Sequence, residues 1–229
     1  MLLFLSALAA TTPTLNGHLI RPGEACYVIS RATPDGLKQI GTMRHTVKRL
    51  KHGSEDALEI ATHQQISRPQ DVLNMVDTYV VRRGDLRPIS YRNSVDGTNK
   101  VELSYAAERV TGSKDEKGEK VAVNQAFEKP TWDANILGSL IAALPIKAGS
   151  TYRLPVFQYA SGLDESTFTV VGEEMVATPK GRERAWVIDT YRDPSRVARY
   201  FISKKTRQEL GYQAMGFKQA LSNTCPTPI

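Results

Sequence analysis

Two cysteines are the side chains of this sequence with the clearest redox chemistry. Cys26 and Cys225 are its only cysteines, and they lie near opposite ends of the 229-residue chain. In an oxidising compartment an even pair of cysteines predicts a disulfide, whereas in a reducing cytosol the same residues stay as two thiols. A structural zinc site needs four ligands, so two cysteines do not predict a metal. We therefore expect a Cys26–Cys225 disulfide if the protein is exported.

The four histidines are scattered along the sequence and do not form a motif for a metal site or a catalytic base. The sequence has four of them: His18, His45, His52 and His63. If the strands that carry His45 and His63 pair across the turn at residues 52–54, the two side chains become cross-strand neighbours. A metal would still need a carboxylate ligand such as Glu59 in an ordered site. We expect exposed strand side chains here and no metal.

Motifs for hydrolytic and nucleotide chemistry are missing from the sequence. No Gly-x-Ser-x-Gly occurs, and Ser139 lies in an apolar helical segment, where a serine hydroxyl bonds its own backbone. Glu173 and Glu174 are adjacent in an expected strand and so point to opposite faces, whereas paired glycosidase carboxylates face one site. Phosphate loops and dinucleotide fingerprints are also missing. We predict a protein that is not an enzyme, with no catalytic residues and no cofactor; a hydrolase is the least favoured alternative.

One segment, residues 133–144, has the apolar spacing of a helix, with Thr131 or Asp133 as its cap and Pro145 as its end. If a curled sheet around this helix is wider than the helix, the gap is an apolar pocket suited to an acyl chain. The alternative is a filled core with no gap. The candidate ligand-binding residues are Trp132, Ile136, Leu137, Leu140, Ile141 and Leu144, with Leu103, Tyr105, Val121 and Val123 from the sheet.

The rest of the chain has the pattern of antiparallel strands. Residues 58–66 alternate in polarity with a period of two, which is typical of a half-buried strand. Asp96-Gly97 is a hairpin signal, and the polar residues 112–119 predict a hairpin loop. About ten short strands predict a mainly β fold: a curled antiparallel sheet, either a half-barrel or an open barrel, wrapped around one short apolar helix. We expect residues 11–229 to form a single β-rich envelope domain.

The first ten residues, Met1–Ala10, are apolar and end in small residues. Ala7-Leu8-Ala9 fits the small-x-small rule of signal peptidase, so residues 1–10 predict a signal peptide and a periplasmic protein. No charged residue precedes Arg21, so we expect this signal to be truncated or minimal. The alternative is an apolar N-terminus on a cytosolic protein. The run is too short to span a bilayer, which takes about 20 apolar residues, so we expect no transmembrane span.

The chain is basic, with a formal net charge of +6 and a pI of about 9.3. Its densest basic run, residues 44–52, alternates between the two faces of an expected strand. The run is either a solvated strand face or a patch for anionic lipids or nucleic acid. No aromatic residue lies among the basic ones as a base-stacking platform. We therefore expect a solvated face and no nucleic-acid partner.

Two stretches of the second half resemble a known family. Leu144–Phe157 contains Leu-Pro, Gly and Tyr, and Val171–Gly181 contains a Val-Gly-Glu sequence followed by a Pro-Lys-Gly turn. With Ala185–Val187 and Tyr200–Arg207, they resemble domain-of-unknown-function family 3108 (DUF3108), a bacterial envelope family, over roughly residues 71–216. The resemblance implies a periplasmic antiparallel sheet curled around a helix, similar in shape to the half-barrels of lipoprotein carriers. Fold similarity of this kind does not fix a function.

Three hypotheses for the function remain, and each predicts a different structure. A carrier of a hydrophobic small molecule or lipid predicts a continuous apolar cavity between sheet and helix. An envelope module that binds a protein partner predicts a filled core with an exposed apolar patch or an unpaired strand edge. An enzyme predicts a cleft where histidine and carboxylate side chains converge. We favour a non-catalytic binding role.

Overall fold

A computed structural model describes residues 13–191 and 197–226 of the chain. The predicted signal peptide, residues 1–10, lies outside the described residues. The first half contains the 3₁₀ helix η1 (Gly17–Leu19) and the strands β1 (Gly23–Thr33), β2 (Gly36–His52), β3 (Glu55–Ser67), β4 (Val72–Arg82), β5 (Pro88–Val95), β6 (Thr98–Ala106), β7 (Arg109–Glu116) and β8 (Glu119–Ala126). The second half contains β9 (Trp132–Asp133), the 3₁₀ helix η2 (Ala134–Ile136), the helix α1 (Leu137–Ala143), β10 (Thr151–Gln158), β11 (Gly162–Thr178), β12 (Gly181–Tyr191), β13 (Val197–Ser203), β14 (Glu209–Ala214) and β15 (Phe217–Ser222).

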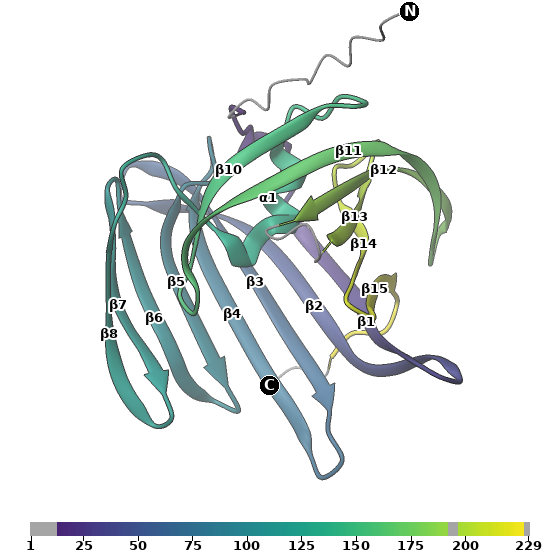
Figure 1. Cartoon of the computed structure of the whole chain (residues 1–229), viewed down its shortest axis with the longest axis horizontal. Coiled ribbons are helices and arrows are strands. Elements are labelled where there is room, and N and C mark those ends of the chain that lie inside the picture. Colours follow the sequence, from purple (N-terminus) through teal and green to yellow (C-terminus); the bar gives the residue numbers. More distant parts are fainter. Residues whose placement is uncertain (1–12, 192–196, 227–229) are drawn as a thin grey trace, which may run out of the picture.

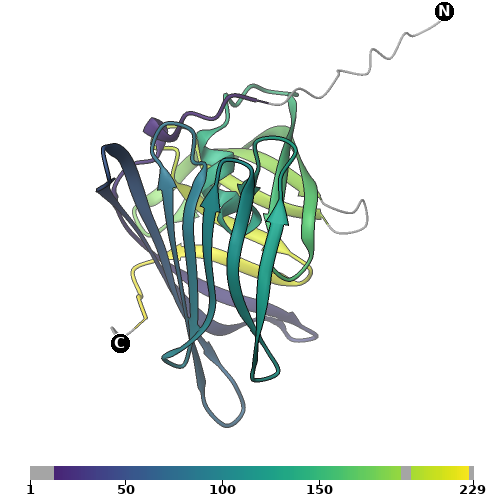
Figure 2. The ribbon, with the colours of Figure 1, turned by 90° about the vertical axis from the view of Figure 1, so that its left-hand side faces the viewer.

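All fifteen strands form one sheet, in the order β8-β7-β6-β5-β4-β3-β2-β1-β15-β14-β13-β12-β11-β10-β9. Neighbouring strands are antiparallel except for β9 and β10, which are parallel. The first and the last strand, β1 and β15, pair in the middle of the sheet, and strands from the middle of the chain form its edges. The sheet curls around α1 without closing, as Figure 1 shows. In Figure 2 the strands of the first half form a wall in front of the second half.

This architecture confirms the expected curled antiparallel sheet around one short helix, but about ten strands was an underestimate. Residues 112–119 are not a loop: β7 and β8 run through them and only Lys117 and Gly118 form the turn. Both turn residues have positive φ, 57° and 92°, as do Asp96 and Gly97 in the hairpin between β5 and β6. Two-residue turns with positive φ match the twist of paired strands, so the polar residues 112–119 form a regular β7–β8 hairpin. β15 was not predicted as a strand.

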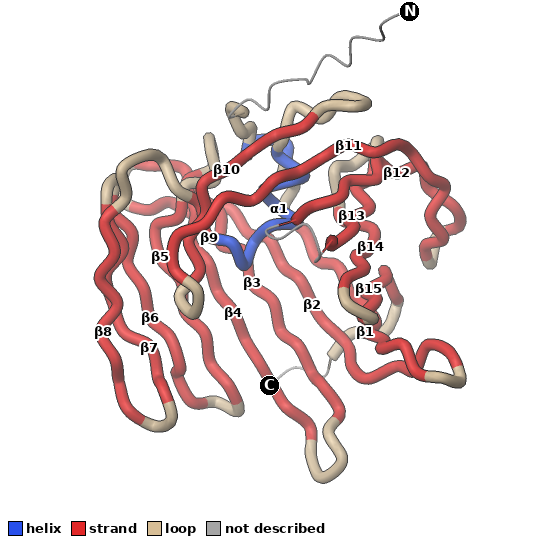
Figure 3. Tube along the Cα trace, viewed as in Figure 1, coloured by secondary structure: helices blue, strands red, loops and turns tan. Residues whose placement is uncertain are grey.

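The short helix fills the upper part of the concave face, where Figure 3 shows it between strands from both halves of the chain. The predicted helix 133–144 begins instead as strand β9 and one 3₁₀ turn, and α1 covers only Leu137–Ala143. Asp133 caps this turn as predicted, since its side chain accepts a hydrogen bond from the Asn135 N–H at 2.8 Å. Leu140 and Ile141 are fully buried in the main core. In the described part of the chain, no helix is long and apolar enough to cross a membrane.

A second, smaller core lies on the opposite face of the C-terminal strands. Ala185, Val187, Phe201 and Leu210 are buried there, with Val176 and Leu221 packed against them. Val176 belongs to the distal part of β11, beyond a register shift between Val170 and Gly172. Such irregularities increase the bend of a strand, and β11 bends far enough to contact β15. The C-terminal strands are therefore packed on both faces.

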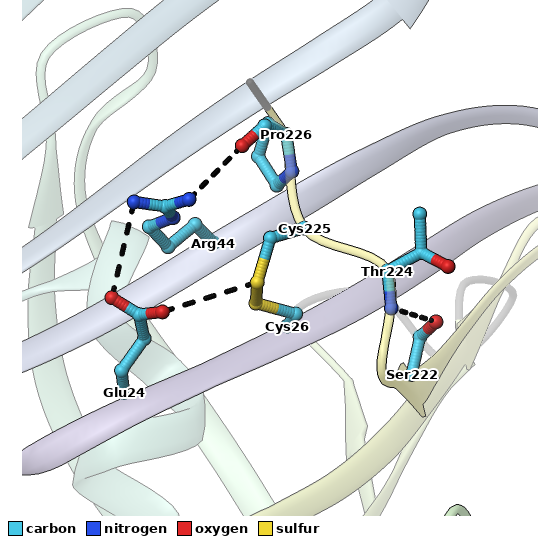
Figure 4. Close-up of a disulfide and its surroundings, with 7 residues drawn as sticks. All are labelled: Glu24, Cys26, Arg44, Ser222, Thr224, Cys225 and Pro226. Carbon is cyan, nitrogen blue, oxygen red and sulfur yellow. Dashed lines mark hydrogen bonds and ion pairs between the residues drawn. A yellow bond between two sulfur atoms is a disulfide. The ribbon is translucent and has the colours of Figure 1, made fainter. Parts of the chain in front are cut away.

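The predicted disulfide between Cys26 and Cys225 is confirmed (Figure 4). It joins β1 to the segment after β15, with a Cα–Cα distance of 5.0 Å across a sequence separation of 199 residues. Arg44 of β2 lies beside it, forming an ion pair with Glu24 at 3.9 Å and donating a hydrogen bond to the Pro226 carbonyl at 3.1 Å. The bridge thus fastens the C-terminal segment to the central strands.

Candidate functional site

A cavity of about 640 Å³ lies between the concave face of the sheet and the start of the helical segment. Strands β1–β5 contribute one wall, β13–β15 contribute the other, and η2 with the first turn of α1 closes it from above. Residues 20–24 before and within β1, and residues 206–208 before β14, also line it. The curled sheet is therefore wider than the helix it surrounds, and the core is not completely filled.

The predicted ligand-binding residues divide into two groups in the structure. Ile136 and Leu137 line the cavity. The other helix positions, Leu140, Ile141 and Leu144, are fully buried in the main core. They pack the helix against the sheet and do not line the cavity.

The remaining predicted residues lie toward the edge of the sheet and away from the cavity. Trp132 is buried and its indole N–H donates a hydrogen bond to the Asp85 carbonyl at 2.8 Å. Leu103 is buried, and Val123 packs against the same core. The Tyr105 hydroxyl donates a hydrogen bond to the Asp133 carboxyl at 2.5 Å. Val121, on the edge strand β8, is 37% exposed.

The first wall of the cavity carries a buried carboxyl, Asp77 of β4. Its Oδ1 accepts hydrogen bonds from the Tyr91 hydroxyl at 2.8 Å and from the Asn93 amide at 2.9 Å. Its Oδ2 accepts one from the Thr62 hydroxyl at 3.3 Å. Thr62 and Asn93 stand directly opposite Asp77 on the neighbouring strands. One cross-strand row thus supplies the donors that a buried carboxylate requires.

Three tyrosines lie next to this row and give the wall an aromatic surface. Tyr79 and Tyr91 stack with ring centroids 4.6 Å apart, and Tyr159 lies 5.8 Å from Tyr91. Burial is the main cause that raises the pKa of all three hydroxyls. They therefore stay protonated near neutral pH and can both donate and accept hydrogen bonds.

The opposite wall carries a second carboxyl, Glu209 at the start of β14. Its Oε1 accepts a hydrogen bond from the Gln219 amide at 2.9 Å. Its Oε2 lies so close to Gly138 of α1 that a methyl group there would overlap it. Burial raises the pKa of Glu209 from 4.5 to about 8. A pKa of about 8 favours the protonated form of this carboxyl near neutral pH.

A bulge in β14 brings Glu209 to this wall together with an aromatic neighbour. Glu209 pairs with Ile202, while Gly211 pairs with Phe201, so Leu210 is an extra residue in the ladder. Leu210 faces the second core, whereas Glu209 and Tyr212 both line the cavity. Bulges commonly re-aim side chains in this way.

The pH dependence of stability is expected to change when Glu209 is replaced by Gln. In wild type the unfolded chain releases the Glu209 proton as pH rises above 4.5, whereas the folded protein retains it up to a pH of about 8. The free energy of unfolding of wild type therefore decreases across this pH range. The Gln side chain in Glu209→Gln does not titrate, so the variant should not lose stability for this reason. Urea unfolding at pH 5 and pH 8.5 should show the variant gaining stability relative to wild type at the higher pH. Parallel pH profiles would contradict the raised pKa.

The histidines do not form a shared site, because the register separates the two that were predicted as neighbours. His45 pairs with Thr62, and His63 pairs with Arg44. His45 lines the cavity, where burial lowers its pKa to about 4, so it is neutral near pH 7. His63, one position along from Thr62, points to the other face of the sheet. The basic run on β2 is a strand face, with Lys48 and Lys51 paired to Glu59 and Asp56 of β3.

A patch of exposed apolar side chains lies away from the cavity, where the β1–β2 and β14–β15 hairpins meet the start of β13. Leu37, Val197, Met215 and Phe217 line a groove of about 490 Å³ there. Met215 is 69% exposed and Leu37 is 57% exposed. An exposed apolar patch is one of the two features that the interaction-module hypothesis predicts, whereas the filled core that it also predicts is not observed.

Sequence reasoning missed most residues of the cavity wall. Asp77 and Tyr79 alternate on one face of β4, and this polar pair on a core-facing strand was a signal that could have been found. Glu209 gave no such signal, because the bulge at Leu210 shifts the alternation of β14 by one residue. The paired walls also depend on β1 joining β15, which no local pattern reveals.

The comparisons with known proteins concern the family and the fold. The sequence model of a family described as "Protein of unknown function (DUF3108)" matches residues 26–213. The chain is similar to a β-barrel-like protein of domain of unknown function DUF1849 from Brucella abortus, at 12% identity and a TM-score of 0.57, covering 93% of this chain and 98% of that chain. It is also similar to a protein predicted to be exported, with a YmcC-like fold, from Bacteroides fragilis, at 12% identity and a TM-score of 0.36, covering 92% and 97%. A search of curated proteins finds no match. The Brucella similarity shows a shared fold alone.

Proposed function

The chain belongs to the DUF3108 family, and because the function of that family is unknown, we propose a role from the geometry of the cavity. The protein is a non-catalytic binding protein that holds a small amphiphilic molecule inside its curled sheet. The observation that carries this proposal is the cavity of about 640 Å³ between sheet and helix. Ligand sites in proteins commonly have about 300–1,000 Å³.

The lining supports an amphiphile rather than a bare acyl chain. The apolar lining residues Met43, Val47, Ile60, Ile136 and Leu137 are suited to contact the hydrocarbon part of a ligand. The hydrogen-bonding groups around Asp77 and Glu209 lie on the two walls beside it. The lining is therefore mixed, with polar and apolar groups both well represented, and placed polar groups fix the orientation of a ligand.

A non-catalytic role in the periplasm fits the same observations. Asp77 in the cavity accepts hydrogen bonds from Tyr91 and Asn93, and burial lowers the pKa of His45 to about 4, which disfavours it as a proton acceptor near pH 7. No described cavity residue forms a nucleophile–base pair of the kind that acyl transfer needs. The Cys26–Cys225 disulfide supports an oxidising compartment, since such bonds persist outside the reducing cytosol.

A variant that fills the cavity is expected to weaken ligand binding by about tenfold or more. Ala142 of α1 is buried and lines the cavity, so Ala142→Leu places extra methyl groups in the space that the ligand would occupy. The probe is Nile red, a neutral amphiphilic dye, titrated by fluorescence. Ala122→Leu, the same change at an exposed position of β8, is the control and should bind like wild type. No saturable binding to wild type, or equal binding by both variants, would overturn the proposal.

A protein-binding role is the second candidate, and the exposed patch at Leu37, Val197, Met215 and Phe217 favours it. Native mass spectrometry of unreduced wild type separates the two candidates. A bound small-molecule mass that disappears on organic extraction supports the carrier. A dimer mass that Phe217→Ser removes would instead show that the patch joins two copies.

A further inference from the structure

The Glu209 wall of the cavity combines a carboxyl with no cationic partner and three tyrosine rings. We call it the Glu209 pocket and define it by Glu209, Tyr27, Tyr200 and Tyr212, all of which line the cavity. Among the described residues, Gln219 alone donates a side-chain hydrogen bond to the carboxyl, and none forms an ion pair with it. Glu209 is half-buried at the cavity wall, and a carboxyl withdrawn from bulk water normally takes a charged partner or several donors. The Glu209 carboxylate is therefore free to form an ion pair with a bound cation.

Three tyrosines from three different strands line the cavity together with this carboxyl, and both the Glu209 carboxyl and the Tyr200 ring lie near Gly138. Tyr200 of β13 and Tyr212 of β14 are directly paired, with ring centroids 5.0 Å apart. Tyr27 of β1 is buried, and its hydroxyl donates a hydrogen bond to the Glu209 backbone carbonyl at 2.9 Å. Burial, and secondly the charge of Glu209, raises the pKa of all three tyrosines. Aromatic rings attract cations through their negative faces.

The other charged groups of the cavity leave this pocket acidic. Asp77 on the facing wall is a second carboxyl, satisfied by neutral donors. Arg207 points its guanidinium to the Leu144 carbonyl at 3.2 Å, and burial lowers its pKa. Arg21 lies in an exposed segment at the rim, and His45 is neutral near pH 7. Carboxyls and aromatic rings thus dominate the interior.

We infer that the ligand of this cavity is an alkylammonium amphiphile, whose charged nitrogen lies between the Glu209 carboxyl and the rings of Tyr27, Tyr200 and Tyr212. Its hydrocarbon chain would extend along Ile136 and Leu137. This inference rests on the proposed function and names the ligand class of the same site. Carboxylates and aromatic rings together form the usual protein environment for organic ammonium groups.

Proton release accompanies such binding. Burial raises the pKa of Glu209 to about 8, which favours its protonated form at pH 7 when no cation is bound. A bound ammonium favours the charged carboxylate and lowers this pKa. The affinity should therefore rise by up to about tenfold per pH unit below pH 8 and level off above it. The titratable groups facing Glu209 are Tyr27, Tyr200 and Tyr212, whose raised pKa values keep them neutral across this range.

The test compares three probes that share one chain and differ in charge: octylammonium, 1-octanol and octanoate. Isothermal titration calorimetry of the unreduced protein at pH 8.5 should show octylammonium binding about tenfold or more tightly than 1-octanol, and octanoate binding most weakly. Titrations in buffers of different ionisation enthalpy at pH 7 should detect the released proton for octylammonium alone.

Two variants separate the charge from the shape of the pocket. Glu209→Gln keeps the size of the side chain and an oxygen for Gln219, and it should lose the octylammonium preference and the proton release while still binding 1-octanol. Gly138→Ala displaces the carboxyl from its position and should weaken octylammonium alone. The wild-type comparison holds even if a variant fails to fold.

The outcomes distinguish this inference from the proposed function. If 1-octanol or octanoate binds as tightly as octylammonium to wild type, the ammonium assignment is wrong and the cavity still binds amphiphiles. A retained preference in Glu209→Gln would also overturn the assignment. If none of the three probes binds wild type, the proposed function fails as well.

Discussion

Removing the disulfide, by Cys26→Ser together with Cys225→Ser, is expected to lower the free energy of unfolding by about 5 kcal/mol. The bond joins residues 199 positions apart, so it closes a loop of nearly the whole chain. In the chain-entropy account, a crosslink stabilises the folded state by restricting the unfolded one, and the effect grows with loop length. For a protein of this size the loss corresponds to a fall in Tm of about 10–20 °C.

Thermal unfolding followed by circular dichroism checks this expectation. Wild type treated with a reductant should unfold at the same temperature as the double serine variant, and oxidised wild type should unfold well above both. The single variant Cys225→Ser, with Cys26 left as a thiol, should behave like the double variant. If the double serine variant loses less than about 1 kcal/mol of unfolding free energy, strand pairing without the disulfide is sufficient to stabilise the centre of the sheet.

Leu140→Ala is expected to destabilise the protein by about 2–5 kcal/mol. Leu140 is one of the fully buried side chains through which α1 packs into the main core. Truncation removes buried methyl groups and leaves a void that the surrounding strands cannot close, because the sheet is fixed by its hydrogen bonds on either side. The change should also loosen the helix over the cavity.

The matched control is Leu163→Ala, which is the same substitution at a residue 46% exposed in the β10–β11 hairpin region. It should alter the free energy of unfolding by no more than about 0.5 kcal/mol. Urea unfolding of both variants measures the difference. Equal effects at the two sites would mean that the helix is not an essential part of the core.

Local sequence patterns predicted the elements that depend on local chemistry. The hairpin at Asp96-Gly97 and the capping of the helical segment by Asp133 follow from nearby residues, and both are present. The apolar positions Leu140, Ile141 and Leu144 were correctly placed on the inside of the curled sheet. The family resemblance and the mainly β fold were recognised from the same kind of pattern.

What the sequence did not predict depends on contacts between distant strands. The Glu209 pocket draws on β1, β13 and β14, so its composition is set by the β1–β15 pairing. The bulge at Leu210 reverses which side chains of β14 face inward, and alternation alone would misplace them. The burial of Asp77 was not predicted, because it depends on the donors that neighbouring strands supply. These features require a known register.

The pairing of β1 with β15 in the centre of the sheet has a consequence for how the chain assembles. Each half can form by pairing of successive hairpins, since consecutive strands from β1 to β8 and from β10 to β15 are neighbours in the sheet. The two halves become one sheet only when the last strand, β15, pairs with the first, β1. During synthesis or export, the complete sheet therefore cannot form until the C-terminal strand is available. Contacts so distant in sequence form slowly. The Cys26–Cys225 bond lies directly beside this pairing, with Cys26 opposite Ser222, so in the folded protein it covalently secures the place where the two halves join.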